Sequence, residues 1–377
     1  MLSEGSSKRH RDLRTGRIPL VIILGGGKDQ IPLIQAAHRR SWETLVIDRD
    51  SSVEGARKAT YFLQRSLFDT REILQEVENL AANHHVTAVL ARTSAEKTLW
   101  TALALSDQYR LPGLEDRILS LATNKRLLRE FCQKRGIPVP TGWHCDTFPE
   151  SAFPVIVKPQ STIQGKKGIY LCSDKEHLQE VYPECRKLSA NGQVEIQEFM
   201  PGLDSTCFCI FDRGAAKPLF WWDELVGIDE QGLIRGLGVS LPSRLEASAL
   251  RLRAESIMGT MAQLFPTLRY PLLFSFRVDP SSSRVALIEI HADLGGDLIA
   301  DYLIPHASGW NLFDSVLQIL SDEPITDRVP DPEEATLLYT DSGVRIVKGT
   351  CPVHIRPILD QVLEERKIKL SRYPEGF

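Results

Sequence analysis

The first part of the chain alternates short apolar runs with longer amphipathic runs. From residue 18 onward, "IPLVIILGGG", "WETLVIDRD" and "VTAVLAR" are apolar runs of strand length. Between them, "DQIPLIQAAHRRS" and "TREILQEVENLAANHH" have the pattern of amphipathic helices. Strands that alternate with helices in this way predict βαβ units and a parallel sheet.

The pattern changes after residue 120. "LATNKRLLREFCQKRGIPVPTGW" has a period near 3.6 and predicts a helix stopped by Gly136, with two prolines that force an extended exit. "FPVIVKPQSTIQGKKGIYLCSD" then predicts two strands joined by a glycine-containing loop. Further β runs follow, with an amphipathic helix near "WNLFDSVLQIL", a polar link "PITDRVPDPEE" and a last β unit, "ATLLYTDSGVRIVKG".

These changes of pattern predict a protein that is α/β in its first part and α+β in the rest. Residues 1–17 are expected to form a flexible basic tail, and residues 18–120 a Rossmann-like βαβ domain. We expect a second, larger domain over 121–325, with a smaller subdomain at about 150–200. Residues 326–377 are expected to form a C-terminal subdomain that contains β structure.

Composition narrows the class of protein. With 377 residues, 42% hydrophobic and 25% charged, the chain can bury a substantial core. A net charge of -4 gives no support for a general nucleic-acid or membrane-surface role. No apolar run approaches the roughly 20 residues of a membrane span, and the polar, basic start lacks a secretory signal, so we expect a cytoplasmic protein. The seven scattered cysteines are expected to be reduced and packed as small apolar residues.

The glycines after the first predicted strand invite a dinucleotide-binding interpretation. Gly25 and Gly27 begin the G-x-G-x-x-G pattern, but Gln30 stands where its third glycine should be. Asp48, at the end of the second strand, would suit a ribose hydroxyl, although acids also end such strands for turn reasons. A nicotinamide-dependent oxidoreductase therefore stays open as an alternative.

A second candidate site lies in "ALIEIHADLGGDLIADYL". Glu289 and His291 are two residues apart on a predicted strand, so their side chains share one face while the isoleucines pack behind them. A glycine pair and Asp297 follow, and Asp297 is expected to cap the next helix. Such a pair indicates either a functional site on a rigid strand or a solvated strand end.

The order of these motifs resembles the ATP-grasp superfamily, and most closely its carboxylate-amine ligases, with biotin carboxylase and D-alanine-D-alanine ligase as more distant relatives. The resemblance runs from Ile18 through "NKRLLREFCQKRGIPVP", "VIVKP", "QEFMPG" and "EIHADLGGD". It implies that residues 18–120 form a pre-ATP-grasp domain. It also implies that residues 121–325 form two α+β subdomains, one of them a lid, which hold ATP between them.

The resemblance implies a set of nucleotide contacts. A lysine at the end of a strand projects a point charge suited to phosphate oxygens, although such lysines are more often solvated. The loop "STIQGKKG" offers amides and cations for a lid over the triphosphate. Backbone groups of "EIQEFMPGLD" would hold adenine, and an acid after them the ribose hydroxyls. The implied residues are Lys125, Lys158, Gly165, Lys166, Lys167, Gly168, Gln197, Glu198, Met200 and Asp204.

The resemblance also implies a metal site at the Glu-x-Asn position of the family. Glu289 occupies the family's glutamate position, whereas His291 replaces the asparagine. Magnesium is the ion that the family implies, and the imidazole of His291 makes manganese the alternative. The family's acid on the preceding strand falls near Ser275, and Asp279 is the nearest carboxylate. Asp293 stands where the family has an arginine. Arg277 and Arg235 are therefore candidates for the catalytic cation that binds the substrate anion, and either one would otherwise be a structural ion-pair partner.

The resemblance implies an ATP-dependent carboxylate-amine ligase, of amino-acid or peptide type, that works through an acyl phosphate and releases ADP and phosphate. The glycine loop Gly25–Gly27 would help bind the acceptor substrate. The expected partners are a small carboxylate and an amine, with no nucleic acid or membrane, and a homodimer is allowed. The alternatives are carboxylation of the biotin-carboxylase kind and a nucleotide-binding regulatory protein that has lost catalysis.

Overall fold

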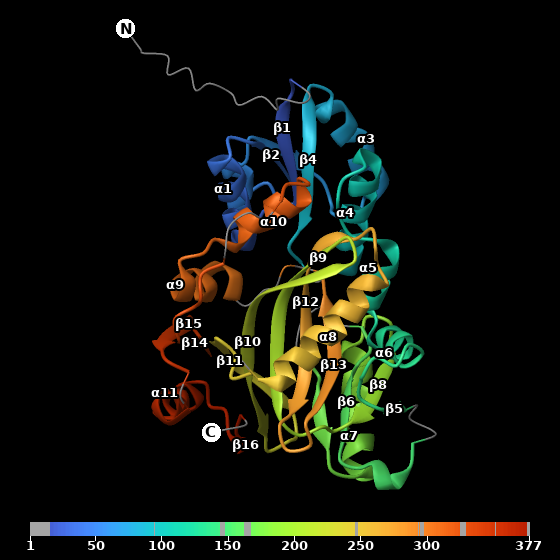
Figure 1. Ribbon diagram of the computed structural model, residues 1–377, viewed down its shortest axis with the longest axis vertical. Coiled ribbons are helices and arrows are strands. Elements are labelled where there is room, and N and C mark those ends of the chain that lie inside the picture. Colours follow the sequence, from blue (N-terminus) through green and yellow to red (C-terminus); the bar gives the residue numbers. More distant parts are fainter. Residues whose placement is uncertain are drawn as a thin grey trace. The chain divides into compact units, whose positions relative to one another are not determined.

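The computed structural model describes residues 16–93, 95–143, 148–161, 167–245, 248–292, 294, 298–324, 329–350 and 352–374. It divides into two compact units (Figure 1). The first comprises Met1–Glu115 with Asn311–Asp327, and the second comprises Asp116–Trp310 with Arg328–Phe377.

The first unit is built on a four-stranded sheet of order β3-β2-β1-β4, in which every pairing is parallel. Strand β1 is apolar along its whole length and the middle of β2 is buried, because helices lie on both sides of the sheet, α1 on one and α3 and α4 on the other (Figure 1). The predicted βαβ pattern is confirmed. Its elements are β1 (Ile18–Leu24), η1 (Lys28–Gln30), α1 (Ile31–Arg39), β2 (Glu43–Asp48), α2 (Glu54–Lys58), β3 (Tyr61–Gln64), α3 (Thr70–Ala81), β4 (His84–Ala91), α4 (Glu96–Tyr109) and α10 (Leu312–Leu320).

The second unit contains a large antiparallel sheet of eight strands. Its order is β13-β12-β9-β10-β11-β14-β15, and β16 pairs with β10. Helix α8 packs on β10, β12 and β13, and α11 packs on β14. These elements are β9 (Leu203–Asp212), β10 (Ala215–Asp229), β11 (Ile234–Leu241), α8 (Ala249–Gln263), β12 (Arg269–Asp279), β13 (Arg284–His291), η3 (Ile299–Leu303), α9 (Ile304–Ser308), β14 (Ala335–Thr340), β15 (Gly343–Lys348), α11 (Pro352–Glu365) and β16 (Leu370–Arg372).

A smaller four-stranded antiparallel sheet of order β5-β8-β6-β7 also belongs to the second unit. Helix α7 packs on β6, β7 and β8 and closes a core formed by Val155, Val157, Leu178, Cys185 and Ile196. The hairpin predicted around the glycine-containing loop is confirmed by the antiparallel pairing of β6 with β7. The elements are α5 (Asp116–Thr123), α6 (Lys125–Gln133), β5 (Gly142–Trp143), η2 (Glu150–Ala152), β6 (Val155–Pro159), β7 (Tyr170–Cys172), α7 (Lys175–Leu188) and β8 (Val194–Glu198).

Two details differ from the sequence-based expectation. The helix expected up to Gly136 is two helices, α5 and α6, because Asn124 leaves the helical conformation and its side chain caps α6 by accepting from the Leu127 amide. Helix α10 belongs to the first compact unit, although residues 311–325 were expected to close the second domain. The domain boundaries at 120 and 325 stay predictions.

The cysteines that the structure describes are buried free thiols. The cysteines at positions 132, 172, 185, 207 and 209 are buried and free, and burial raises the pKa of the Cys132, Cys172 and Cys185 thiols to about 12. Cys145 and Cys351 lie outside the described residues. Of the helices in the described ranges, none combines the length and apolar character that crossing a membrane requires.

Candidate functional site

A row of polar side chains crosses one face of the large sheet. Ser275 in β12 lies opposite Glu289 in β13 on one side and opposite Thr206 in β9 on the other. Thr206 in turn lies opposite Trp222 in β10. Directly opposed residues of neighbouring antiparallel strands point to the same side of a sheet, so these side chains share a face.

A second polar row lies two residues further along the same strands. Arg277 lies opposite Asp204, and Asp204 lies opposite Glu224. Side chains two residues apart in a strand point to the same face, so this row adjoins the first. We call the surface formed by the two rows the polar face.

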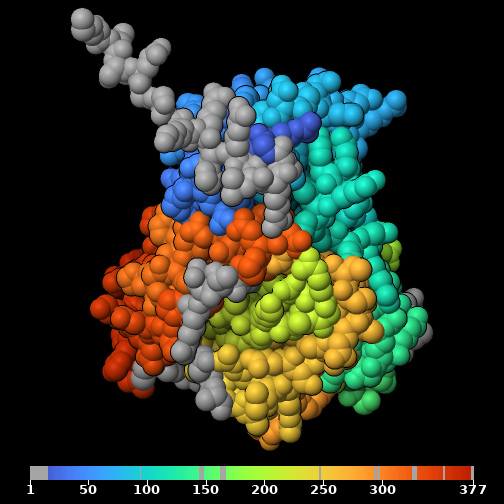
Figure 2. Space-filling view, turned by 45° about the horizontal axis from the view of Figure 1, so that its top comes forward, coloured from blue at the N-terminus to red at the C-terminus, as the bar shows by residue number. Residues whose placement is uncertain are grey.

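Helix α8 lies on the opposite side of the sheet. Trp221 points away from the polar face because its neighbour Trp222 points toward it. The Arg251 guanidinium of α8 lies 5.8 Å from the Trp221 ring centroid. In Figure 1 α8 crosses the strands on the side toward the viewer, and Figure 2 shows this helix in gold beside the yellow-green β9–β10 hairpin. The polar face is therefore the side of the sheet that α8 does not cover.

Glu289 is the centre of a charged cluster at one end of the polar face. Lys125 Nζ lies 3.2 Å from its Oε1, and His291 Nε2 lies 3.2 Å from its Oε2. Burial alone would raise the pKa of Glu289, but Lys125, His291 and Lys158 oppose it, and together they hold that pKa well below its usual range. Glu289 is thus an ionised carboxylate, as a metal ligand or charge-binding group must be.

Lys158 is the most unusual cation of the site. It lies on β6 with only 3% of its surface exposed. Burial lowers the pKa of its ammonium; nearby Lys125 also lowers it, while Glu289, Glu195 and Asp204 raise it. Among the described residues this ammonium makes no hydrogen bond or ion pair. A buried cation without a direct partner is costly, so an anionic ligand would relieve an unfavourable state of the folded chain.

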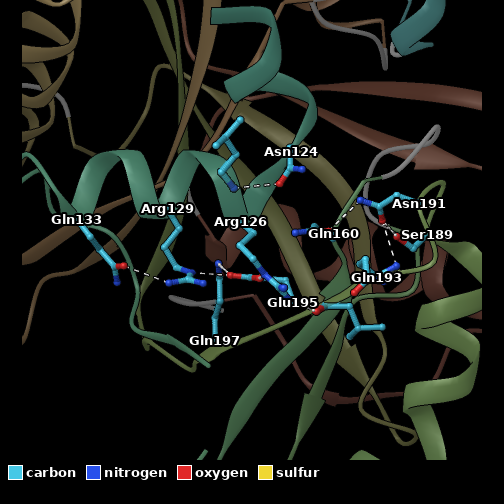
Figure 3. Close-up of polar contacts among 12 residues, drawn as sticks. Asn124, Arg126, Arg129, Gln133, Gln160, Ser189, Asn191, Gln193, Glu195 and Gln197 are labelled. Atoms are coloured by element: carbon cyan, nitrogen blue, oxygen red, sulfur yellow. Dashed lines mark hydrogen bonds and ion pairs between the residues drawn. The ribbon is translucent and has the colours of Figure 1, made fainter. Parts of the chain in front are cut away.

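A buried ion network holds Lys125 and Lys158 in register. Arg126 and Arg129 extend from α6 to the fully buried Glu195 of β8, with Nε to carboxylate distances of 3.1 and 2.6 Å (Figure 3). The Lys125 amide donates to the Gln160 carbonyl just after β6, at 3.3 Å. Because β8 pairs with β6, the network fixes the start of α6 against the strand that carries Lys158.

The segment between β8 and β9 is the expected hinge for adenine. Gln197 is buried and donates to Glu195 at 3.4 Å, whereas Glu198 pairs with Arg284 at 2.6 Å. Met200 is 3% exposed. Its carbonyl accepts a 2.7 Å hydrogen bond from Arg277 Nε, and Arg277 Nη1 lies 3.1 Å from Asp204 Oδ1. Arg277 thus joins the hinge to Asp204, a position that favours an organising role over contact with a reacting anion.

The expected lid loop is described only in part. Gly165 and Lys166 lie outside the described residues. Lys167 is exposed, and Gly168 adopts a positive φ of 70°, where a Cβ would lie 2.6 Å from a Leu188 methyl. Gly168 is therefore required by its backbone conformation and by close packing on α7.

Two candidates lie away from the charged cluster. Asp279 lies opposite Arg284 at the turn between β12 and β13, four residues and about 13 Å along the strand from Ser275. It accepts hydrogen bonds from Ser281 and Ser282 within that turn. Arg235 pairs with Asp229 at 2.9 Å near the end of the β10–β11 hairpin. The structure does not bring Asp279 to Glu289, and we leave it out of the proposed metal site.

The donor atoms around Glu289 decide whether a metal ion fits. Magnesium takes oxygen ligands and often keeps one or two protein carboxylates together with phosphates of the substrate. Glu289 is ionised, and the Ser275 hydroxyl lies on the opposite strand. Within the described ranges, no group of three His, Cys, Asp or Glu side chains is arranged to hold an ion. The site therefore fits a magnesium ion that nucleotide phosphates complete, and not one held by the protein alone.

Several site residues escaped the sequence analysis. Glu195, Arg126 and Arg129 looked like ordinary charged residues of a strand and a helix. Thr206 and Glu224 belong to no motif of the resemblance. The alternation of "FWWDEL" does place Trp222 and Glu224 on one face, but which strands flank them follows only from sheet order.

Comparison with known proteins supports the fold. No protein-family model and no curated protein matches the sequence. Among solved structures, phosphoribosylglycinamide synthetase from Anaerococcus prevotii is 14% identical with a TM-score of 0.65, and the match covers 93% of this chain and 99% of that one. The L-amino acid ligase from Bacillus licheniformis is 20% identical with a TM-score of 0.67, covering 86% and 80%.

A third similar structure is the biotin carboxylase domain of the Hydrogenobacter thermophilus 2-oxoglutarate carboxylase, a dimer in complex with MgADP, ADP and bicarbonate. It is 14% identical with a TM-score of 0.68, and the match covers 95% of this chain and 91% of that one. At these identities the similarity establishes the fold. The chain therefore has the ATP-grasp fold that the order of its motifs predicts.

Proposed function

We propose that the protein is an ATP-dependent carboxylate-amine ligase. The observation that carries the proposal is the buried Lys158 ammonium, without a hydrogen-bonded or ion-paired partner among the described residues, beside the ionised Glu289 and Lys125. Such an arrangement suits a polyanion with a bound cation, because phosphate would pair with the lysines while Glu289 offers a carboxylate to the cation.

The nucleotide is proposed to follow the polar face from the hinge to Glu289. The backbone around Glu198 and Met200 would bind adenine, and Asp204 would accept hydrogen bonds from the ribose hydroxyls. The phosphates would then reach Lys125 and Lys158. A cation shared with Glu289 would neutralise charge that develops on the transferred phosphoryl group. The loop with Gly165, Lys166, Lys167 and Gly168 is proposed to cover them.

The chain's own groups would act mainly by position and charge. A substrate carboxylate oxygen attacks the γ-phosphorus, the bond to the β,γ-bridging oxygen breaks, and ADP leaves. The amine then attacks the acyl carbon, phosphate departs and the amine loses a proton. Lys158 would hold a phosphate oxygen, and Lys125 would exchange its Glu289 partner for phosphate. No side-chain nucleophile is required, because the groups would act through position and charge.

A nucleotide-binding protein without catalysis is the second candidate. Ser275 stands where the family has an acid, and both Lys125 and His291 already contact Glu289. Carboxylation of the biotin-carboxylase kind is a third, which one similar structure with bound bicarbonate favours. The proposed acceptor amine distinguishes the ligase from both.

Product analysis tests the proposal. Purified protein with Mg-ATP and a panel of carboxylates and amines should release ADP and phosphate only when acid and amine are both present. Release of AMP and pyrophosphate would overturn the acyl-phosphate mechanism, and turnover that requires bicarbonate and free biotin would favour the carboxylase. Nucleotide binding without turnover would favour the regulatory protein. A rise in melting temperature with NADH but none with Mg-ATP would restore the dinucleotide interpretation.

Two variants test the proposed roles of Glu289 and His291. Glu289→Gln should reduce turnover at least about 100-fold while ATP still binds, because it removes charge from the cation side of the site. His291→Asn should keep activity with magnesium and change the preference between magnesium and manganese. Full activity in Glu289→Gln would contradict the site. The proposed homodimer is checked separately, by light scattering of the purified protein.

A further inference from the structure

A chain of hydroxyl groups crosses the polar face and ends on a carboxylate. Ser275 Oγ and Thr206 Oγ1 are 3.0 Å apart. Thr206 Oγ1 donates to Glu224 Oε1 at 3.3 Å, and Trp222 Nε1 donates to the same oxygen at 3.3 Å. The chain thus connects β12 through β9 to β10, starting beside Glu289.

The direction of the protons in this chain follows from the chemistry of its members. A hydroxyl has one proton, and an ionised carboxylate only accepts. Thr206 uses its proton for Glu224, so it must accept the proton of Ser275. Ser275 Oγ is then left with lone pairs only, and these are available on the side of Glu289. Such an oxygen suits a cation and repels a phosphate oxygen.

Burial holds the side chains of this hydroxyl chain in place. Thr206 and Trp222 are each 2% exposed, so neither can replace its partner with water. The Glu224 carboxylate, two strands away, thus acts through Thr206 on Ser275, the residue opposite Glu289. In the ATP-grasp family that position, here Ser275, is held by an acid.

We propose that Ser275 is a cation ligand of the nucleotide site, and that Thr206 and Glu224 position it by holding its proton away from the cation. The inference rests on the proposed nucleotide site and adds the reason why a serine can stand in place of an acid. Glu224 would supply negative charge without touching the cation. The side chains of Ser275 and Glu289 would lie on either side of the cation.

We call the hydrogen-bonded chain from Ser275 through Thr206 to Glu224 the relay. Measurements of metal binding, made without turnover, test it. Binding of Mn2+ to the full chain saturated with a non-hydrolysable ATP analogue is measured by electron paramagnetic resonance. Ser275→Ala, Thr206→Val and Glu224→Gln should each weaken Mn2+ about tenfold, as expected for loss of a ligand or of the groups that orient it. Analogue binding in EDTA, measured by calorimetry, should change less than about twofold in all of them.

The opposite face of the same strands provides a matched control. Ser205 and Ser243 form a hydroxyl pair at 3.0 Å, and Ser243 donates to Asp223, so a similar chain ends on a buried acid away from Glu289. Ser205→Ala should leave Mn2+ affinity within about twofold of the parent. In the Glu224→Gln background, Ser275→Asp should restore tight Mn2+ binding, since it places a carboxylate directly at the ligand position.

Each result decides between the relay and its rivals. If Glu224→Gln weakens the analogue equally with and without metal, Glu224 contacts the nucleotide and the relay is wrong. It is equally wrong if the three variants match Ser205→Ala, or if Ser275→Asp fails to restore Mn2+ binding. A parent protein that binds no ATP analogue at all would contradict the proposed function itself, a result distinct from all of these.

Discussion

The glycine loop of the first unit and the polar face of the second both place acids near features associated with nucleotides, but their polar groups have different partners. In the first unit the Gly26 amide donates to Asp48 at 2.8 Å, and the Gly55 amide donates to the Gly26 carbonyl at 2.8 Å. Gln30 extends to the Arg92 carbonyl. The acid that suited a ribose hydroxyl therefore already binds the glycine loop.

The charged cluster at the end of the polar face differs because its charges remain incompletely compensated. Lys158 is buried with a lowered pKa, and Glu289 shares its carboxylate between two cations. The comparison shows that a motif indicates a binding site only when its polar groups are not already used by the fold. The following variants test the contrast.

Glu195→Gln should have the largest effect on stability. It leaves Arg126 and Arg129 facing a neutral group inside the network that fixes α6 to β8. Breaking a buried ion pair from one side costs about 3 to 5 kcal/mol, which urea unfolding would measure. As a control, Glu255→Gln removes a more exposed pair with Arg251 on α8 and should cost less than about 0.5 kcal/mol. Equal losses would show that the network does not organise the site.

Lys158→Met should separate binding from stability. It keeps the buried stem and removes the charge, so the affinity for ATP should fall by about 2 to 3 kcal/mol, roughly 30- to 150-fold, while the unfolding free energy stays equal or rises. Calorimetry and urea unfolding measure the two quantities. Lys28→Met, in η1 directly after the glycine loop of the first unit, is the control and should bind ATP like the parent. Loss of affinity in Lys28→Met would move the nucleotide to the glycine loop.

Gly26→Ala should affect the first unit alone. A Cβ at this glycine would lie 2.6 Å from a Val53 methyl and 3.1 Å from a Val46 methyl, so the variant should lose about 2 kcal/mol of stability by overpacking. Melting temperature reports the loss. Nucleotide affinity measured below the transition should not change. If ATP binding disappears while the variant remains folded, the glycine loop contacts the nucleotide.

Asp279→Asn should have the smallest effect, and one that depends on pH. Hydrogen bonds from Ser281 and Ser282 lower the pKa of Asp279 from 3.8 to about 2. The folded pKa lies below the unfolded value, so the stabilisation is present above about pH 4 and is lost as pH falls toward 2. The variant should be about 1 kcal/mol less stable at pH 6, and the difference should shrink on acidification. Unchanged Mn2+ affinity would support leaving Asp279 out of the metal site.

Much of the site could be proposed from the sequence because its main charges lie in recognisable local patterns. Lys158 ends an apolar run and Glu289 alternates with isoleucines, and both signals are short in range. Arg277 was proposed as a catalytic cation, yet it binds the Met200 carbonyl and Asp204. A sequence does not show which partner a long, flexible side chain takes, because the partner comes from another strand.

The sequence by itself determined the order and type of the elements, because apolar period, glycine and proline act within a few residues. Only the tertiary structure decided that Asp279 lies at a turn away from Glu289, and that Thr206 and Glu224 stand in one chain with Ser275. The physical reason is strand register. The sheet brings together residues that are far apart in sequence, 69 positions in the Thr206–Ser275 pair, and a shift of one residue would turn each of these side chains to the other face.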